Sequence, residues 1–350
     1  MERMRVAVIG THHAGMDFHL PGLSAFDDIE LSICDINPAV LHTAGDRFGI
    51  PRERRYADYR ELLRREDPAA VLVLMAQYPV YTETEACELV LTTRSRDAYV
   101  EIVFEVLRQK RSLMVEKPLA MTPEEALPLV RAAEQAGVVT MVSENRRFNP
   151  LVQHCRASVL ARGPMLAVSC HFYKGEPVRR TVRLRNGRTA PHPETVNWLT
   201  GDMMHALYLM RHLGGGEIVE FSTSAANVPG DTQPTAFYAL ARFAGGATGL
   251  FSANVRVGAR REVWEMHGMG ISAYIETAAD GPHETSMTAR LYTGNDSRHP
   301  EVVRDHELAG SKGLPACAGF TAADRAFIDC VRANRQPPCT FADAYTTLCY

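Results

Sequence analysis

The chain has 350 residues, of which 46% are hydrophobic and 23% charged, a composition typical of globular proteins with one or two domains. A formal net charge of -3 argues against a nucleic-acid-binding protein, which normally carries a basic stripe. The sequence contains no run of about eighteen apolar residues, so it predicts no membrane-spanning helix.

The cysteines and the N-terminus indicate the compartment. The eight cysteines are scattered and form no C-x-x-C pair. This spacing favours free thiols in a reducing compartment over a disulfide framework or a zinc site. Residues 1–5 lead directly into an apolar strand pattern, without the apolar core of a signal peptide. We therefore expect a cytoplasmic protein without a metal site.

In the first part of the chain, strand patterns alternate with helical patterns. Short apolar runs rich in β-branched residues are typical of buried parallel strands. The predicted strands are residues 5–10, 29–34, 69–75, 113–115 and 138–142. The predicted helices are residues 14–26 with a break at Pro21-Gly22, 39–48, 58–65, 98–109 and 122–136. Such alternation predicts a doubly wound parallel sheet with right-handed crossovers.

After about residue 145 the pattern changes to longer strands with fewer helices. The predicted strands are residues 166–173, 217–225, 236–243, 247–255, 262–266, 272–276 and 287–292, and the predicted helices are 150–162, 202–213 and 322–333. We therefore expect an α/β protein of two domains. Residues 1–144 form a dinucleotide-binding Rossmann domain. Residues 145–350 form an α+β domain with a large, mostly antiparallel open sheet.

A glycine-containing turn follows the first predicted strand. In the dinucleotide fingerprint G-x-G-x-x-G, the first glycine makes the turn and the third allows close packing of helix on strand. Gly10 and Gly15 take these positions, whereas His12 takes the middle one, where a side chain can crowd a pyrophosphate. Asp35 lies twenty residues beyond Gly15, where a carboxylate can bind the ribose hydroxyls of NAD and repel the extra phosphate of NADP. The alternative is an ordinary βαβ turn with Asp35 as a loop residue.

The string Glu116-Lys117-Pro118 ends the apolar run at residues 113–115. The carboxyl edge of a parallel sheet is where open α/β folds bind ligands. A lysine there could hydrogen-bond a substrate hydroxyl or carbonyl and assist its proton transfer. The alternative is a surface ion pair at a strand end, which contributes little.

Further polar residues lie in the second half. Asp202 and His205 are three residues apart on a predicted helix and so share a face. Histidine titrates near neutral pH and suits acid-base chemistry, although a helix-start aspartate with a partly buried histidine is the simpler interpretation. The polar segment 144–150 follows the last strand of the first domain. Its side chains either bind substrate or cap the next helix.

Together these residues resemble the Gfo/Idh/MocA oxidoreductase family, which includes glucose–fructose oxidoreductase and inositol dehydrogenase. The most specific match is Glu116-Lys117-Pro118-Leu119-Ala120. The similarity extends to residues 6–15, 56–63, 243–247 and 320–348, and to His205 with Gly214. The resemblance thus covers nearly the whole chain.

The resemblance implies an NAD(P)-dependent oxidoreductase acting on CH–OH groups of a sugar, cyclitol or related polyhydroxy substrate. Lys117 and His205 would handle the substrate oxygen and its proton. Asp202, in the turn before His205, would replace the aspartate that many relatives have three residues after this histidine. NAD(H) is preferred over NADP(H), and the Lys117-Pro118 bond is often cis in relatives. The second-domain sheet would form a homodimer or homotetramer.

The expected contacts with the cofactor and substrate follow from the same resemblance. Expected cofactor contacts are Gly10, Thr11, His12, His13, Gly15, Asp35, Ile36, Asn37, Met75, Tyr99, Glu116 and Lys117. Expected substrate contacts are Asn145, Arg147 and Tyr208.

Some positions depart from the family pattern. Tyr208 stands where many relatives have aspartate, Tyr99 stands where relatives often have histidine, and residues 77–93 resemble an insertion. Two other functions therefore stay open. One is a glycosidase that uses NAD transiently, and the other is a dinucleotide-binding sensor or regulator without catalysis.

Overall fold

A computed structural model describes residues 3–75, 89–175, 181–183, 189–191, 199–228, 234–277, 287–294, 296–310 and 313–350. Most of the expected insertion at 77–93 lies outside these residues. The chain divides into two compact units. The first unit contains residues 1–144, 183–190 and 320–349, and the second contains residues 145–182, 191–319 and 350.

The sheet of the first unit has six parallel strands in the order β3-β2-β1-β4-β5-β6. The strands are β1 (Met4–Ile9), β2 (Ile29–Cys34), β3 (Arg55–Tyr56), β4 (Ala70–Val73), β5 (Ser112–Val115) and β6 (Thr140–Val142). The order reverses between β1 and β4, as in doubly wound nucleotide-binding folds. The predicted parallel sheet is therefore confirmed.

Helices connect these strands, and side chains of Asn37, Asp58 and Thr122 cap the starts of three of them, at residues 38, 59 and 123. They are η1 (Ala14–His19), α1 (Leu20–Leu23), α2 (Pro38–Arg47), α3 (Tyr59–Glu66), α4 (Leu89–Arg108) and α5 (Pro123–Ala136). The Thr122 hydroxyl accepts the Glu125 N–H at the start of α5, and Gly137 ends that helix in the left-handed region at φ 66°.

The expected interruption at Pro21-Gly22 is instead a change of helix type. Residues 14–19 form a π-helix that continues into α1. Pro21 lies in the first turn of α1, where its missing N–H leaves no broken bond.

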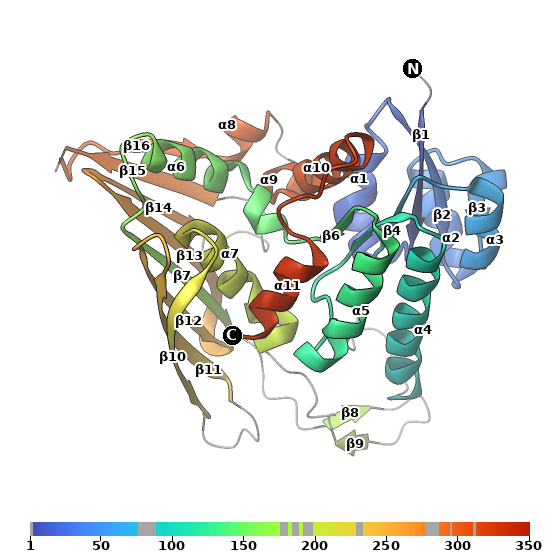
Figure 1. Ribbon diagram of the computed structural model, residues 1–350, viewed down its shortest axis with the longest axis horizontal. Coiled ribbons are helices and arrows are strands. Elements are labelled where there is room, and N and C mark those ends of the chain that lie inside the picture. The colour runs from blue at the N-terminus through green and yellow to red at the C-terminus, as the bar shows by residue number, and fades with distance from the viewer. Residues whose placement is uncertain are drawn as a thin grey trace. The chain divides into compact units, whose positions relative to one another are not determined.

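Two C-terminal helices belong to the first unit by their contacts. Helix α10 (Phe320–Arg332) packs on η1 and α1, and α11 (Phe341–Leu348) packs on α5 and β6 (Figure 1). The Val142 N–H also donates to the Cys339 carbonyl at 2.8 Å. The first unit therefore begins and ends the chain, whereas the predicted boundaries assigned residues 320–349 to the second domain. The sequence up to residue 144 does not indicate that residues 320–349 fold back onto the first unit.

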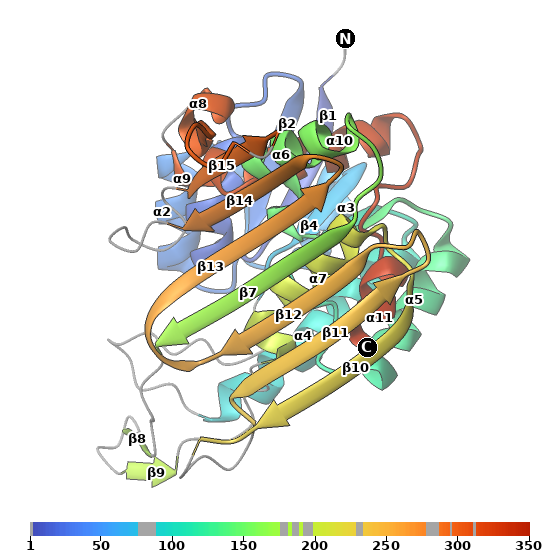
Figure 2. The same ribbon diagram turned by 90° about the vertical axis from the view of Figure 1, so that its left-hand side faces the viewer.

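The sheet of the second unit has eight strands in the order β10-β11-β12-β7-β13-β14-β15-β16. Figure 2 shows its strands from β10 to β15 side by side. Of its strand pairs, β12 and β7 run parallel and the others antiparallel. The strands are β7 (Ala167–Gly175), β10 (Ile218–Ala226), β11 (Ala236–Phe243), β12 (Thr248–Asn254), β13 (Arg256–Gly268), β14 (Ile271–Thr277), β15 (Met287–Thr293) and β16 (Glu301–Arg304). The predicted mostly antiparallel sheet is confirmed.

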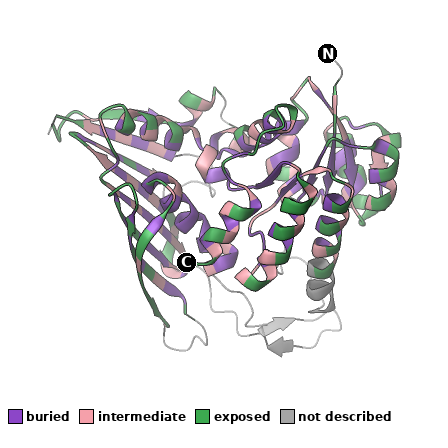
Figure 3. Ribbon diagram, viewed as in Figure 1, coloured by how far each residue is buried: buried purple, intermediate pink, exposed green. Residues whose placement is uncertain are grey.

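Helices α6 (Pro150–Leu160) and α7 (Met204–Gly214) cover one face of this sheet. The other elements are η2 (Arg52–Arg54) in the first unit, η3 (Asn145–Phe148), η4 (Leu199–Met203), α8 (Asp305–Ala309) and α9 (Leu314–Cys317) in the second, and a ribbon of β8 (Thr181–Arg183) and β9 (Thr189–Pro191). Residues of β11 alternate between buried and exposed, so the opposite face of the sheet keeps exposed side chains (Figure 3). Trp264 and Phe172 lie fully buried in the core under the covered face.

Two further expectations concern thiols and membranes. The cysteines that the structure describes are all free, and Cys349 alone among them is exposed. Across the described ranges, no helix is both long and apolar enough to cross a membrane.

Candidate active site

The glycine turn after β1 has the close packing that its sequence predicts. Gly10 adopts φ 92°, and a Cβ atom there would lie 3.0 Å from the Leu74 carbonyl oxygen. A Cβ atom on Gly15 would lie 2.6 Å from the Gly10 carbonyl oxygen. Any side chain at Gly15 would therefore push the helix away from the strand. Met75 lies next to the turn, with its Cγ 3.1 Å from the same Gly10 Cβ position.

Asp35 binds the backbone of this turn from the end of β2. Its Oδ2 accepts hydrogen bonds from the Thr11 N–H at 2.8 Å and the Thr11 hydroxyl at 3.1 Å. Its Oδ1 accepts the Asn37 N–H at 2.9 Å, and Asn37 in turn caps α2. Ile36, between them, is 88% exposed. The structure thus brings Gly10, Thr11, Asp35, Ile36 and Asn37, all predicted cofactor contacts, to one edge of the sheet.

The two histidines of the turn are exposed. His13 Nδ1 lies 3.0 Å from Asp17 Oδ2, one turn along the helix. His12 takes the middle position of the fingerprint, and its side chain is not packed into the turn.

Glu116 and Lys117 follow β5 at the same sheet edge. The Lys117-Pro118 peptide bond is cis, as the resemblance implies. Glu116 Oε2 accepts the Lys117 N–H at 3.1 Å. Tyr99 is fully buried on α4, where its hydroxyl donates to the Leu119 carbonyl at 3.1 Å and burial raises its pKa. Tyr99 therefore supports the backbone just after Lys117.

A histidine that the sequence did not single out holds the other oxygen of Glu116. His19 Nε2 lies 2.9 Å from Glu116 Oε1, and His19 Nδ1 lies 2.7 Å from Asp324 Oδ1 on α10. His19 and Asp324 have no exposed surface. Burial lowers the pKa of His19, but Asp324 and Glu116 outweigh burial and raise it to about 10. His19 is therefore an imidazolium at neutral pH.

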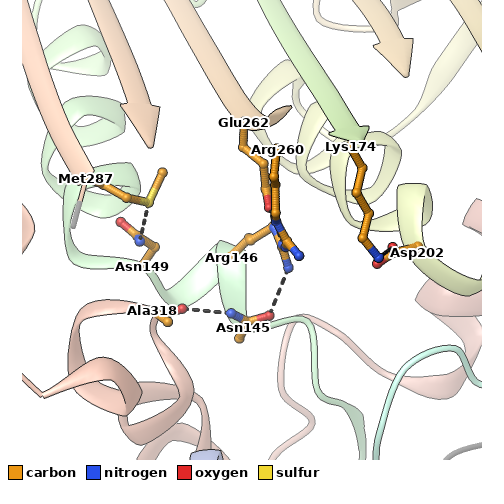
Figure 4. A network of polar contacts seen from close by, with 9 residues as sticks. All are labelled: Asn145, Arg146, Asn149, Lys174, Asp202, Arg260, Glu262, Met287 and Ala318. Carbon is orange, nitrogen blue, oxygen red and sulfur yellow. Dashed lines mark hydrogen bonds and ion pairs between the residues drawn. The ribbon is translucent and has the colours of Figure 1, made fainter. Parts of the chain in front are cut away.

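In the second unit, Asp202 and His205 lie on consecutive helical turns. Asp202 belongs to η4, and His205 is buried in the first turn of α7. Lys174, which the sequence did not indicate, reaches Asp202 from β7 with its Nζ 2.7 Å from Oδ2 (Figure 4). Both side chains of this ion pair are about four-fifths buried. The carboxylate of Asp202 thus has a cationic partner from the sheet.

Two predicted substrate contacts touch each other. Arg147 Nη1 donates to the Tyr208 hydroxyl at 3.3 Å. Farther along α7, burial together with Arg147 and Arg156 lowers the pKa of His212 to about 3. His212 is therefore neutral, and this end of the unit is rich in positive charge.

Asn145 forms structural hydrogen bonds within the second unit. Its amide nitrogen donates to the Ala318 carbonyl at 2.8 Å, and its amide oxygen accepts from Arg146 Nη1 at 3.4 Å (Figure 4). Arg146 in turn holds Glu262 through bonds of 2.6 and 2.5 Å. Burial raises the pKa of Glu262, but Arg146 and Arg260 outweigh it and lower the pKa. A contact of Asn145 with substrate stays a prediction.

Metal chemistry has no support in the described ranges. Among these residues, no group of three or more His, Cys, Asp or Glu side chains is placed to hold a metal ion.

Comparisons with known proteins point in one direction. Residues 4–144 match the family model "Oxidoreductase family, NAD-binding Rossmann fold". D-apiose dehydrogenase from Paraburkholderia graminis is 29% identical over 154 residues, which cover 44% of this chain and 35% of that protein. An NADP(+)-dependent scyllo-inositol 2-dehydrogenase from Bacillus subtilis is 25% identical over 149 residues, which cover 43% and 35%. The chain thus matches about a third of the length of these curated relatives.

The fold extends the similarity along the chain. A solved levoglucosan dehydrogenase in complex with NADH and levoglucosan superposes with a TM-score of 0.71 at 18% identity. The superposition covers 99% of this chain and 95% of that one. Both units therefore have the fold of a known dehydrogenase.

Proposed function

We propose that this chain, whose residues 4–144 belong to the Gfo/Idh/MocA oxidoreductase family, is an NAD(H)-dependent oxidoreductase of a polyhydroxy compound. It transfers hydride between nicotinamide and a carbon of a sugar, cyclitol or related substrate. The observation that carries the proposal is the position of Lys117. This lysine follows strand β5 at the carboxyl edge of the sheet, where the glycine turn and Asp35 also lie.

The residues of the first unit fit a dinucleotide. Gly10 and Gly15 leave room for a close backbone approach, and the helix that follows directs its N-terminus toward the turn. Each carboxylate oxygen accepts about two hydrogen bonds. Oδ2 of Asp35 already accepts two from Thr11, whereas Oδ1 accepts one from Asn37 and keeps capacity for one ribose hydroxyl. Asp35 would repel the negatively charged 2′-phosphate of NADP. This favours NAD(H) over NADP(H).

When bound, the nicotinamide supplies the acceptor for the hydride that leaves the substrate carbon. The chain's own residues handle the oxygen. In the oxidative direction, Lys117 orients the substrate hydroxyl and His205 accepts its proton. Asp202, paired with Lys174 at 2.7 Å, places a carboxyl group on the same helical segment as His205. Arg147 and Tyr208 act as hydrogen-bond donors to other substrate oxygens.

The remaining expectations extend the proposal to assembly and location. Large side chains on the open face of the second sheet are partly exposed, including Tyr238, Leu240, Leu250 and Tyr274. This face is the proposed contact of a homodimer or homotetramer, and the oligomer's mass in solution tests it. A cytoplasmic location is proposed from the free cysteines.

Binding and turnover measurements test the function. NADH and NADPH are titrated separately, and NAD is then mixed with D-apiose, levoglucosan or scyllo-inositol while NADH absorbance is followed. We expect NADH to bind at least about tenfold more tightly than NADPH, and at least one polyol to produce NADH. An Asp35→Ala variant should lose most of this preference. Failure of both dinucleotides to bind would contradict the proposal.

The same measurements separate the alternatives. A glycosidase that uses NAD transiently would cleave a glycoside with no net production of NADH. A sensor would bind NADH but convert no polyol. Before catalysis is rejected in favour of a sensor, the substrate panel is extended to further aldoses, polyols and uronic acids.

A further inference from the structure

Three side chains form a buried charged network in the first unit: His19 on η1, Glu116 after β5 and Asp324 on α10. The ring of His19 bridges the two carboxylates, at 2.9 Å to Glu116 and 2.7 Å to Asp324. His19 and Asp324 are 305 residues apart in sequence, so the network ties the two ends of the chain together.

We propose that His19 is a positioning residue: it holds the Glu116 carboxylate against the backbone amide of Lys117 and so fixes the lysine at the end of β5. The inference rests on the proposed function of Lys117. It assigns a role to His19, Glu116 and Asp324 that acts through Lys117 and needs no contact of His19 or Asp324 with substrate.

The geometry fits an imidazolium, which can donate to both carboxylates at once. A neutral histidine carries one N–H, so it could donate to one carboxylate while its other nitrogen faced the second with a lone pair. A protonated ring donates to both, and both distances lie in the range of charge-assisted hydrogen bonds. Because the site is buried, an unpaired charge there would be strongly unfavourable. Each member of the network therefore depends on the others.

Packing fixes the ring as well as its charge. The ring of Phe320 meets the His19 ring edge-on at 5.3 Å, and the Ser143 hydroxyl lies 3.4 Å from Nε2. Helix α10 is anchored in turn, because Arg325 forms two bonds of 3.0 Å to Asp28. The groups that face His19 are thus Asp324 and Phe320 from α10, Glu116 from the end of β5, and Ser143 after β6.

The connection to Lys117 goes through the two oxygens of one carboxylate. Glu116 Oε1 accepts from His19, while Oε2 accepts the Lys117 N–H at 3.1 Å. The carboxylate cannot rotate without breaking one of these bonds. Without His19, Glu116 would be free to turn toward solvent or toward the Lys117 ammonium group. Either movement would release the lysine from its fixed direction.

A double-mutant cycle on NADH binding tests the inference without a known substrate. His19→Gln is combined with Asp324→Asn, so that the fully buried Asp324 is not left without its counter-charge and the net charge of the network is unchanged. The pair is made with and without Lys117→Ala. We expect the pair to weaken NADH binding about tenfold in the native background and less than about twofold beside Lys117→Ala. Equal losses in both backgrounds, or no loss in the native one, would overturn the inference.

Two further measurements keep the test independent of folding defects. Glu116→Gln preserves shape and should show the same dependence on Lys117. Histidine-selective NMR of the native protein should find both nitrogens of His19 protonated at neutral pH, and a neutral ring would overturn the inference.

The control is His299→Gln, which removes an exposed histidine 2.9 Å from Asp296 and should leave NADH binding unchanged. Should the native protein itself fail to bind NADH, the proposed function fails first. An additive cycle in a protein that does bind NADH rejects only the role of His19.

Discussion

The two units hold their candidate residues in different ways. In the first, Gly10, Asp35, Met75 and Glu116 each follow a different parallel strand, and the topology alone gathers them at one edge. In the second, Asp202, His205 and Tyr208 share one helical segment, and their partners come from elsewhere. The first arrangement depends on strand order, whereas the second depends on which distant side chain reaches the helix.

This difference matters because the hydrogen-bond partners of a carboxylate determine its position and its remaining capacity to accept hydrogen bonds. Asp202 pairs with Lys174 at 2.7 Å, so its carboxyl group already accepts a hydrogen bond from a distant side chain. In the first unit, Glu116 is held by His19 and by the Lys117 backbone. Each unit thus contains a carboxylate fixed by a cation, but only Glu116 adjoins the proposed catalytic lysine.

Removing the proposed proton acceptor of the second unit should have a large effect on turnover. We expect His205→Asn to lower kcat/KM for polyol oxidation on the order of a hundredfold or more, because asparagine cannot accept the hydroxyl proton. NADH binding, which the first unit provides, should change little. The control is His154→Gln on α6, a histidine 3.8 Å from Glu301. Near-native turnover by His205→Asn would remove the second unit from the acid-base chemistry.

Changes to the Lys174–Asp202 ion pair should lower kcat/KM by a smaller factor. Lys174→Gln and Asp202→Asn should each lower kcat/KM about tenfold, and the double variant should lose little more than either single one. The physical reason is that each change removes the same interaction. Losses that multiply in the double variant would mean that the two side chains act separately.

The buried network of the first unit should appear in the pH dependence of stability. The pKa of His19 is about 10 in the folded protein against 6.5 for an ordinary histidine. Its contribution is therefore complete below about pH 6.5 and is lost as the pH rises through about 10. We expect the free energy of unfolding to fall by on the order of 2–4 kcal/mol over this window.

The combined His19→Gln and Asp324→Asn variant is the comparison for this measurement. Its unfolding free energy should vary much less between these two pH values, because neither side chain titrates there. Parallel curves for the native protein and the variant would show that His19 does not carry the charge assigned to it.

Local signals made much of the fold predictable. The Thr122 cap and the Gly137 stop mark the bounds of α5. Helix α11 and strand β16 were missed, because one is short and the other is a four-residue edge strand with little alternation. The return of α10 and α11 to the first unit depends on tertiary packing, which periodicity does not encode.

In the candidate site, likewise, the sequence predicted some of the residues but not their distant partners. The turn at Gly10, Asp35 and the string around Lys117 could be found from spacing and from the family resemblance. The partners could not, because His19 meets Asp324 across 305 residues and Lys174 meets Asp202 across 28. Such pairs form only when strands and helices pack, and no local sequence pattern predicts them.

The central claim is that Lys117 serves hydride transfer, and polyol-dependent NADH production by the native protein and Lys117→Ala tests it most directly. The matched control is Lys110→Gln, which changes an exposed lysine after α4. We predict that the native protein and the control produce NADH, while Lys117→Ala loses on the order of a thousandfold in kcat/KM. Undiminished NADH production by Lys117→Ala would contradict the account.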